Sequence, residues 1–395
     1  MKKRIYLDYA ATTPVDPEVL KFIQPYFSTI FGNTQSLHTF GQESSKIVEE
    51  CRDFIALQLN CSPEEIIFTS GGTESNNTAI KGIFFANNFY NKHIITSPIE
   101  HHAVLEPIKF LEKFYNCKIS YLEVNKDGII NVNSLDKLIN EDTVFISVMH
   151  ANNEIGTIQP IEKISQKIRL INKEREKTKK QKIYFHTDAV QTFGHIKIDV
   201  EKLGVDLLSL SGHKFYSPKG IGALYIRKGT KIEPLLHGGG HEFNRRASTV
   251  NHSGIAGMFK AIQISTSVME EENQQIKKLR DKLYNGILNE IKNVEINGSM
   301  TNRLPNNLNV SFYGIEAESL LVALDNEGIA VSSGSACSSG SMEPSHVIKA
   351  IGKDVILARG TIRFSLGRFT TEEEIDMALK ILPPLVEKFR KISPL

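Results

Sequence analysis

The sequence has few cysteines, little net charge and no long apolar run, and each shortage excludes a class of protein. Its four cysteines are widely spaced without a C-x-x-C pair, which argues against a zinc site and a disulfide scaffold. A net charge of +2 gives no reason to expect binding to nucleic acids or membranes. No apolar stretch reaches the roughly 18 residues of a membrane span, and none has the position of a signal peptide. We therefore expect a cytoplasmic protein with reduced thiols and no bound metal.

Short β-branched runs alternate with amphipathic stretches along much of the chain, which is typical of a parallel α/β sheet. Helices are expected between the strands, for example at 74–86, 103–115 and 161–173. The expected strands are 66–69, 93–97, 119–122, 144–149, 183–187, 207–210 and 223–226.

The pattern changes after about Met258, where long helical stretches replace the alternation. The elements expected there are a helix at 258–291, strands at 307–312 and 361–364, and a final helix from Thr371. A chain of 395 residues is long enough for two domains. We predict a large domain at 16–257 and a small α+β domain made of 1–15 and 258–395.

Several polar clusters follow the predicted strands directly. In parallel α/β sheets, ligands bind beyond the carboxyl ends of the strands, so these clusters should meet at one edge. Clusters from five unlinked loops indicate a ligand site more strongly than any one of them. They are Gly71-Gly72-Thr73, His101, Asn152, Asp188 and Ser211-Gly212-His213-Lys214.

Lys214 and Asp188 fit a pyridoxal phosphate (PLP) site. A lysine is rarely placed after a buried strand unless its amine is used, and an amine of lowered pKa can form a Schiff base with an aldehyde cofactor. Asp188 could keep the pyridine nitrogen protonated, which makes the ring an electron sink. Gln191 and Asn152 could bind the phenolic oxygen. Taken singly, Lys214 could be a lysine of a polar loop and Asp188 a helix N-cap.

The remaining clusters could hold the phosphate and the ring of the same cofactor. Gly72 and Thr73 end a strand and open a helix, so backbone N–H groups and the helix dipole would face a phosphate. Ser211 and His213 could add donors. His101 could stack on the ring and act as an acid or base, or it could be a surface histidine at a helix start.

Two further residues carry candidate chemistry. Arg363 lies on a short apolar strand, and its planar guanidinium suits the carboxylate of an amino acid; a structural salt bridge is the alternative. Cys337 lies within the Ser-, Gly- and Ala-rich run 332–341, which favours an exposed loop thiol. Because structural cysteines usually lie on apolar faces, Cys337 is a candidate nucleophile, with a loop thiol of no function as the alternative.

Eight motifs occur in order and together resemble the NifS/IscS-type cysteine desulfurases, in the aminotransferase class V group of PLP enzymes. The likeness spans essentially the whole chain. It implies fold type I, with a mostly parallel seven-stranded sheet in the large domain and a small α+β domain. The motifs are LDYAATTP (7–14), GGTESNN (71–77), NNEIGT (152–157), TDAVQ (187–191), SGHK (211–214), GGGHE (238–242), SGSAC (333–337) and RFSLGR (363–368).

The resemblance implies a role in cofactor binding for each residue of the clusters. Lys214 would form the Schiff base with PLP, Asp188 would bind the ring nitrogen, and His101 would stack on the ring as an acid or base. Gln191 and Asn152 would bind the phenolic oxygen. The phosphate would be held by Gly72, Thr73, Ser211 and His213.

The resemblance also implies a substrate site, a sulfur carrier and a homodimer. Asn33 and Arg363 resemble the site for the substrate carboxylate, and Cys337 resembles the nucleophile that forms a persulfide. Thr249 resembles a threonine that one subunit donates to the phosphate of the other. Residues 338–344 resemble the long loop that passes sulfur to scaffold proteins and tRNA-modifying enzymes.

Two positions depart from the family pattern. Ser248 stands where the family usually has glycine, and a residue with a Cβ loses easy access to positive φ. This substitution bears directly on the placement of Thr249. Thr34 and Gln35 replace the Pro-Ser pair that is common after Asn33.

The resemblance implies a cysteine desulfurase that converts L-cysteine to L-alanine, with a persulfide on Cys337. Its sulfur would serve Fe–S cluster assembly, tRNA thiolation or nitrogenase maturation. A thiol of pKa about 8.5 is little ionised at pH 7, so local activation of Cys337 is expected. A class V aminotransferase or selenocysteine-type lyase would not need Cys337, and a sulfur-relay scaffold would need little catalysis. The presence of Lys214, Asp188 and Cys337 argues against both alternatives.

Overall fold

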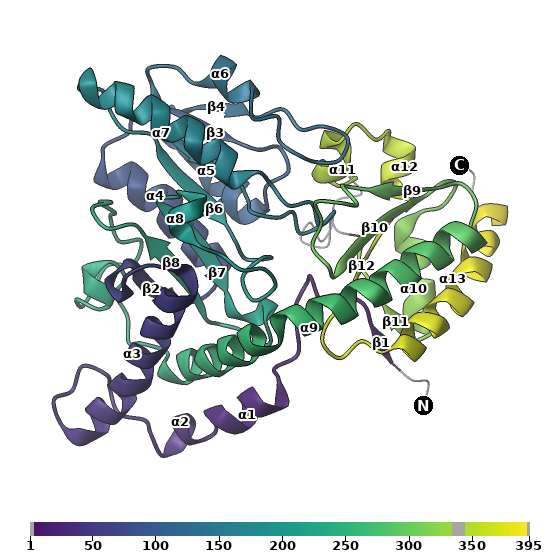
Figure 1. Ribbon diagram of the computed structural model, residues 1–395, viewed down its shortest axis with the longest axis horizontal. Coiled ribbons are helices and arrows are strands. Elements are labelled where there is room, and N and C mark those ends of the chain that lie inside the picture. Colours follow the sequence, from purple (N-terminus) through teal and green to yellow (C-terminus); the bar gives the residue numbers. More distant parts are fainter. Residues whose placement is uncertain (1–3, 334–343, 393–395) are drawn as a thin grey trace.

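Two sheets joined by one long helix organise the computed structural model, which describes residues 4–333 and 344–392 (Figure 1). A seven-stranded sheet lies at one end of the molecule and a three-stranded sheet at the other. Helix α9, His252–Glu290, runs from one end to the other.

The seven-stranded sheet is parallel except for one strand. Its order is β2-β8-β7-β6-β5-β3-β4, and β8 is antiparallel to both of its neighbours. Every predicted strand is present, with ends shifted by at most two residues. The strands are β2 Ile66–Thr69, β3 His93–Thr96, β4 Lys118–Tyr121, β5 Thr143–Ser147, β6 Tyr184–Asp188, β7 Leu207–Ser211 and β8 Gly222–Ile226.

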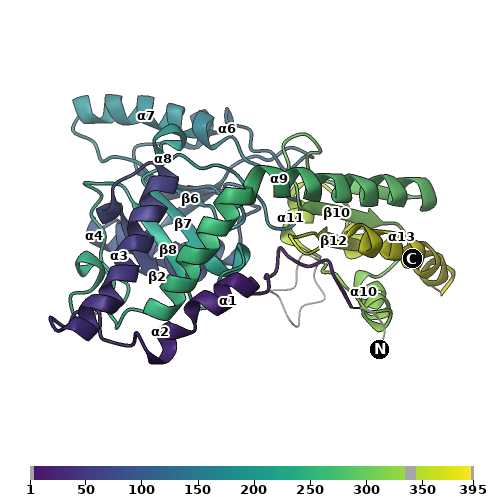
Figure 2. The same ribbon diagram turned by 60° about the horizontal axis from the view of Figure 1, so that its bottom comes forward.

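Helices cover both faces of this sheet, which explains why its inner strands are apolar on both sides. Helices α4, Gly72–Ala86, and α5, His102–Tyr115, pack on one face; α5 presents Val104, Ile108 and Leu111 at helical spacing. The other face is covered by α3, α7 and the first part of α9, and Figure 2 shows α3 and α9 lying across the strands. The bounds are Thr39–Leu59 for α3 and Ile161–Lys177 for α7.

The three-stranded sheet is antiparallel, in the order β12-β10-β9. Strands β10 and β12 lie where they were predicted, whereas β9 was not predicted because its side chains are only partly buried. The N-terminal segment reaches this end of the molecule, where β1 pairs with β11. The strands are β9 Val294–Asn297, β10 Asn307–Phe312, β12 Thr361–Ser365, β1 Ile5–Tyr6 and β11 Ile329–Ala330.

The other helices are short, apart from α13, which packs with α10 and the end of α9 in a second apolar core. Within the described residues, no helix combines the length and apolar character that a membrane crossing needs. The cytoplasmic location stays a prediction. The remaining helices are α1 Pro17–Ile23, α2 Pro25–Ser28, α6 Ser134–Leu138, α8 Val200–Leu203, α10 Ala317–Asn326, α11 His346–Ala350, α12 Val355–Arg359 and α13 Glu372–Ile392.

Helix α9 bears on the predicted division into domains. It begins at His252, six residues before the expected start, and continues without a break past the predicted boundary between 257 and 258. Residues 5–6 pair with 329–330, as expected if the N-terminus belongs with the C-terminal part. The division itself stays a prediction.

A buried ion pair attaches the loop after β8 to the edge of the large sheet. Both nitrogens at the tip of Arg52 on α3 lie 2.9 Å from the carboxylate oxygens of Glu242. Glu242 also accepts the backbone N–H of Phe68 at 2.8 Å, and both side chains of the ion pair are only 4% exposed. Arg52 contacts Glu49 as well, but that carboxylate is 55% exposed.

This pair predicts a large difference between two glutamate substitutions on the same arginine. Glu242→Ala should lower the free energy of unfolding by about 3–5 kcal/mol, because it leaves a buried guanidinium without its partner. Glu49→Ala should lower it by about 0–1 kcal/mol, because water screens the exposed pair. Urea unfolding of both variants measures the difference, and equal losses would contradict the buried pair.

Two buried histidines, one on a strand of the large sheet and one just after another strand, are kept neutral by burial. His186 on β6 contacts the hydroxyls of Ser147 and Ser209 at 2.8 and 3.0 Å, and burial lowers its pKa to about 3. His150 contacts Thr192 at 3.0 Å, and burial lowers its pKa to about 4.

These pKa values predict that the protein loses stability at pH values well above those at which carboxylates ordinarily bind protons. Below about pH 6.5 the unfolded chain binds protons that the folded chain refuses, so stability falls as the pH falls toward 4. Each histidine contributes up to about 1.4 kcal/mol per pH unit. Urea unfolding from about pH 7 to about pH 5 should show this slope, and His186→Gln should remove one histidine's share. An unchanged slope in His186→Gln would contradict the prediction.

Candidate active site

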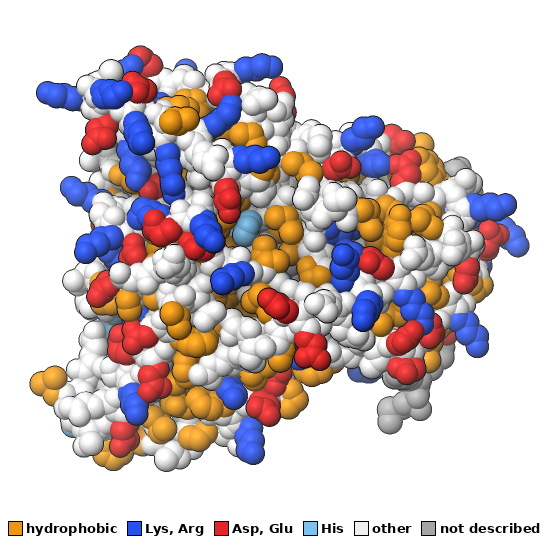
Figure 3. Space-filling view, in the orientation of Figure 1, with side chains coloured by type: hydrophobic (Ala, Val, Ile, Leu, Met, Phe, Trp, Pro, Cys, Tyr) orange, Lys and Arg blue, Asp and Glu red, His pale blue; other side chains and the backbone are white. Residues whose placement is uncertain are grey.

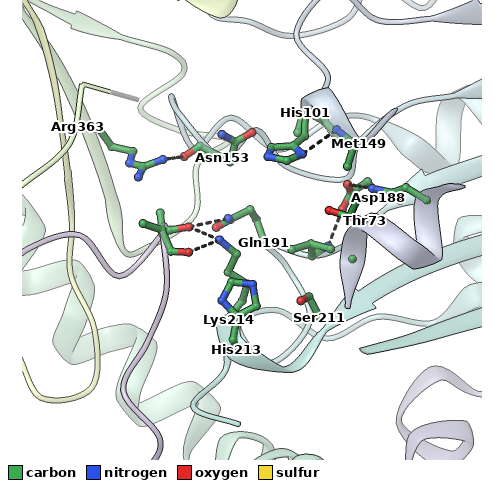
Figure 4. A pocket seen from close by; sticks show the side chains of 16 residues that line it. Thr73, His101, Met149, Asn153, Asp188, Gln191, Ser211, His213, Lys214 and Arg363 are labelled. Atoms are coloured by element: carbon green, nitrogen blue, oxygen red, sulfur yellow. Dashed lines mark hydrogen bonds between the residues drawn. The ribbon is translucent and has the colours of Figure 1, made fainter. Parts of the chain in front are cut away.

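A cavity of about 290 Å³ lies at the carboxyl ends of the parallel strands, where the polar clusters were expected to meet (Figure 4). Its wall also includes Arg363 from β12, so residues of both sheets contribute to it. The predicted site residues in its lining are Gly72, Thr73, His101, Asp188, Gln191, Ser211, His213, Lys214 and Arg363.

Lys214 lies in a single turn after β7, Gly212–Lys214, and its amine faces the N-terminal segment. The Nζ atom donates to the carbonyl oxygens of Ala10 and Ala11 at 2.6 and 2.7 Å. Gln191 donates to the same Ala10 oxygen at 3.0 Å. The segment before α1 therefore forms one side of the cavity.

Asp188 ends β6 and points its carboxylate into the site from the opposite side (Figure 4). Its Oδ1 accepts the backbone N–H of Val190 at 2.9 Å, and its Oδ2 accepts Nδ2 of Asn76 at 2.6 Å. Asn76 was missed by the sequence analysis. It lies three residues after Thr73 on α4, so helical spacing alone could have placed both on one face.

His101 caps the N-terminus of α5 and lines the cavity. Its Nδ1 accepts the backbone N–H of Ala103 at 3.0 Å, which places the proton of the neutral ring on Nε2. Burial lowers the pKa of His101, although the charge of Asp188 opposes that shift. The residue is thus a neutral imidazole with a proton to donate.

The N-terminus of α4 opens onto the cavity beside β7. Gly71 has a φ of +151°, and a Cβ on Gly72 would come within 2.7 Å of Val190, so both positions need glycine. Ser211 and His213 lie opposite, and burial together with the nearby Lys214 lowers the pKa of His213 to about 4.

The sequence allowed Arg363 to be either a site for a substrate carboxylate or a member of a structural salt bridge, and its surroundings are compatible with both. It forms a salt bridge with Asp8 at 2.8 Å and donates to the carbonyl oxygen of Asn153 at 2.9 Å. It also lines the cavity, and its Nε is buried without a hydrogen-bond partner among the described residues.

Asn152 does not line the cavity, contrary to the prediction, and its neighbour Asn153 does. The amide of Asn152 is fully buried and used within its own turn. Its Nδ2 donates to Ile99 at 2.8 Å, and its Oδ1 accepts the N–H groups of Glu154 and Ile155. The two adjacent asparagines cannot be distinguished by the motif alone, because only the turn geometry decides which side chain faces the site.

Asn33 and Thr249 also lie outside the cavity of their own chain, and both are exposed. Asn33 accepts the backbone N–H of Gln35 at 3.0 Å in a local turn. Ser248, before Thr249, has a φ of +105°, so this loop adopts the conformation that favours glycine although it carries serine.

Cys337 lies outside the described residues, in 334–343; one flank of that segment contacts a residue of the cavity lining, and the other contacts residues next to lining residues in the sequence. Ser332 exchanges backbone hydrogen bonds with Arg363. On the other flank, Ser345 donates to the carboxylate of Glu154, and His346 contacts the carbonyl oxygen of Glu100 at 2.9 Å.

The lining fits PLP in size and in the order of its chemical groups. Phosphate donors lie at the N-terminus of α4, the Asp188 carboxylate lies deeper on β6, and the Lys214 amine lies across from them. Arg363 adds a guanidinium to the lining, and its buried Nε has no hydrogen-bond partner among the described residues. Among the described residues, no cluster of His, Cys, Asp and Glu could hold a metal ion.

Comparisons with known proteins agree with this chemistry. The family model for aminotransferase class V matches residues 5–378. A cysteine desulfurase IscS from Dictyoglomus turgidum is 53% identical, with 100% of this chain and 97% of the relative covered.

Solved structures give the same result. A NifS-like protein has a TM-score of 0.87 and 39% identity, with 99% of each chain covered. A structure of SspA in complex with cysteine has a TM-score of 0.79 and 36% identity, covering 94% of this chain and 100% of that one. The chain belongs to the PLP-dependent cysteine desulfurases of the aminotransferase class V family.

Proposed function

We propose that this protein converts L-cysteine to L-alanine and retains the sulfur as a persulfide on Cys337. The supporting observation is the convergence of Lys214, Asp188 and Arg363 on one cavity, where Arg363 also bonds Ser332, close before residues 334–343. The cysteine in the related SspA structure supports the choice of substrate.

The cofactor site would use the residues in the order that they line the cavity. PLP would be bound covalently to Lys214 and would supply an electron sink for the electrons of the substrate Cα–H bond. Asp188 would hold the proton on the ring nitrogen. Gln191 and Asn153 would bind the phenolic oxygen, with Asn153 taking the role first assigned to Asn152.

The phosphate would be held by neutral donors and the helix dipole. Gly72 and Thr73 present the N-terminus of α4, and Ser211 adds a hydroxyl. His213 would donate as a neutral imidazole, since its lowered pKa keeps it uncharged near pH 7.

Arg363 would bind the substrate carboxylate at the mouth of the cavity. Its Nε has no partner among the described residues, and a carboxylate can accept from a guanidinium in two places. Proton transfers would then use the Lys214 amine and the Nε2 proton of His101, both of which belong to residues in the lining.

The sulfur step would form one bond and break another. The Cys337 thiolate would attack the sulfur of the substrate, forming an S–S bond while the Cβ–S bond breaks. The Cβ carbon would keep the electron pair and take a proton, giving alanine and a persulfide. Cys337 follows Ser332 by five positions in the sequence, and Ser332 exchanges backbone hydrogen bonds with Arg363 of the lining.

The persulfide sulfur would supply Fe–S cluster assembly, in keeping with the relatives named cysteine desulfurase IscS. Delivery to tRNA thiolation or another acceptor stays a prediction.

Cys337→Ser is expected to separate desulfuration from cofactor chemistry. The variant should keep the visible absorption of bound PLP and still change its spectrum on adding cysteine, because Lys214 and Arg363 are intact. It should produce almost no alanine, because an un-ionised hydroxyl cannot replace a thiolate. Alanine release and the mass of the Cys337 peptide, with one extra sulfur in the wild type, provide the measurement.

Two control variants complete that test. Cys61→Ser removes a partly buried thiol whose pKa burial raises to about 12, and it should leave alanine production unchanged. Lys214→Ala should lose the absorption of covalently bound PLP. Wild-type alanine production by Cys337→Ser would favour the lyase or aminotransferase alternatives instead.

We propose further that two chains form a homodimer in which Asn33 and Thr249 serve the cavity of the partner subunit. Large apolar side chains are exposed around α1–α3, at the lower left in Figure 3. Contiguous exposed apolar surface of this kind marks a protein interface. The exposed residues are Leu20, Phe27, Phe31, Leu37 and Phe40, with Leu37 92% exposed.

The dimer predicts the effect of charge on this apolar surface. Wild-type protein should scatter light as twice its 44.3 kDa chain mass, and the double variant Phe27→Glu, Leu37→Glu should approach the mass of one chain. Leu170→Glu, on α7, is the control, because Leu170 is also exposed but lies away from this surface. A wild-type monomer, or a dimer unaffected by the two charges, would refute the interface.

A further inference from the structure

We propose that Asn76 is a positioning residue of the cofactor site, which holds the Asp188 carboxylate in the orientation that faces the ring nitrogen of PLP. The inference rests on the proposed function of Asp188. Asn76 belongs to α4, lines the cavity and is only 1% exposed.

The geometry assigns the amide of Asn76 to Asp188 alone. Its Nδ2 lies 2.6 Å from Oδ2 of Asp188, which is a short contact for a charge-assisted hydrogen bond. The opposite orientation would place the amide oxygen against the carboxylate, with two acceptors facing each other. Helix α4 fixes the backbone of Asn76, so the amide holds that oxygen in one place.

The other partner of Asp188 is also neutral. Its Oδ1 accepts the N–H of Val190, and within the described parts of the chain no lysine or arginine forms an ion pair with it. Both hydrogen-bond donors to Asp188 are therefore uncharged. Since each carboxylate oxygen can accept more than one hydrogen bond, Asp188 can still accept from a protonated ring nitrogen.

A second observation indicates that the Asn76 amide has a role other than packing. The Oδ1 atom of Asn76 is buried without a hydrogen-bond partner among the described residues. Burying an unpaired amide oxygen is unfavourable, and leucine would fill a similar volume without that cost. Packing alone therefore does not explain an asparagine in the cavity wall.

Asn76→Leu tests the proposal through the proton on the cofactor itself. Holoenzyme loaded with PLP carrying ¹⁵N in the ring reports by NMR whether the ring nitrogen is protonated. Because the carboxylate is then no longer held toward the ring, the pKa of that nitrogen should fall by about one unit, and PLP binding should weaken about tenfold. Asn77→Leu is the matched control, because Asn77 donates to Thr73 O at 3.0 Å on the exposed side of the same helix.

Asp188→Asn distinguishes failure of this inference from failure of the proposed site. That variant should lose the ring proton altogether. If it does so while Asn76→Leu titrates like wild type, Asn76 is only structural and the inference is overturned. If Asp188→Asn keeps the ring proton, the role of Asp188 itself is wrong. Should Asn76→Leu fail to bind PLP, the smaller Asn76→Ser undergoes the same titration.

Discussion

The turn from Asn153 to Thr157 connects the seven-stranded sheet to the three-stranded sheet through hydrogen bonds, and the candidate active site depends on these contacts. Asn153 accepts Arg363 from β12, and the carbonyl oxygen of Glu154 accepts the amides of Asn307 and Asn309 at 3.1 and 3.2 Å. These contacts bring a residue of the small sheet to the edge of the large one. Together with the N-terminal segment, which bonds Arg363 through Asp8 and Lys214 through Ala10 and Ala11, they fix the position of Arg363 relative to Lys214.

The turn leaves no room for a larger residue at its centre. Gly156 has a φ of +71°, and a Cβ there would lie 2.8 Å from Asn307. The side chain of Glu154 meets Ser345, so the same turn also anchors one flank of the segment that carries Cys337. Under the proposed function, the residue that binds the substrate carboxylate and one flank of the segment that carries the sulfur acceptor therefore share one structural support.

Sequence patterns predicted the edge of the sheet at which the site lies, because β-branched runs mark strands and ligands bind beyond their carboxyl ends. Lys214 and Asp188 followed from that rule. The rule does not say which of two adjacent side chains faces inward, so Asn152 was chosen instead of Asn153. Asn76 was missed for another reason: its spacing from Thr73 indicates the same helix face, but not that its partner is a carboxylate from a strand 112 residues away.

Sequence patterns are also limited for residues that would act across a subunit interface, because they do not say which chain a residue serves. Motifs place Asn33 and Thr249 in a cofactor or substrate site, yet a single chain leaves both in solvent. At Ser248 the sequence pattern did predict the structure. The family preference for glycine implied a positive φ, and the backbone has a positive φ although the residue is serine. Local conformation is thus retained where the residue type changes.

The contacts of Lys214 have a consequence for the N-terminal segment that follows from counting protons. A lysine amine carries three, and two of them point at the carbonyl oxygens of Ala10 and Ala11. If Lys214 binds PLP covalently, as proposed, its nitrogen would keep at most one proton, and one of the two carbonyls would lose its donor. Ala10 also accepts from Gln191, whereas no second donor to the Ala11 carbonyl is found among the described residues. Under the proposed function, binding of the cofactor would therefore change the hydrogen bonding of the Ala11 carbonyl, and the N-terminal segment would differ between the loaded and the empty site.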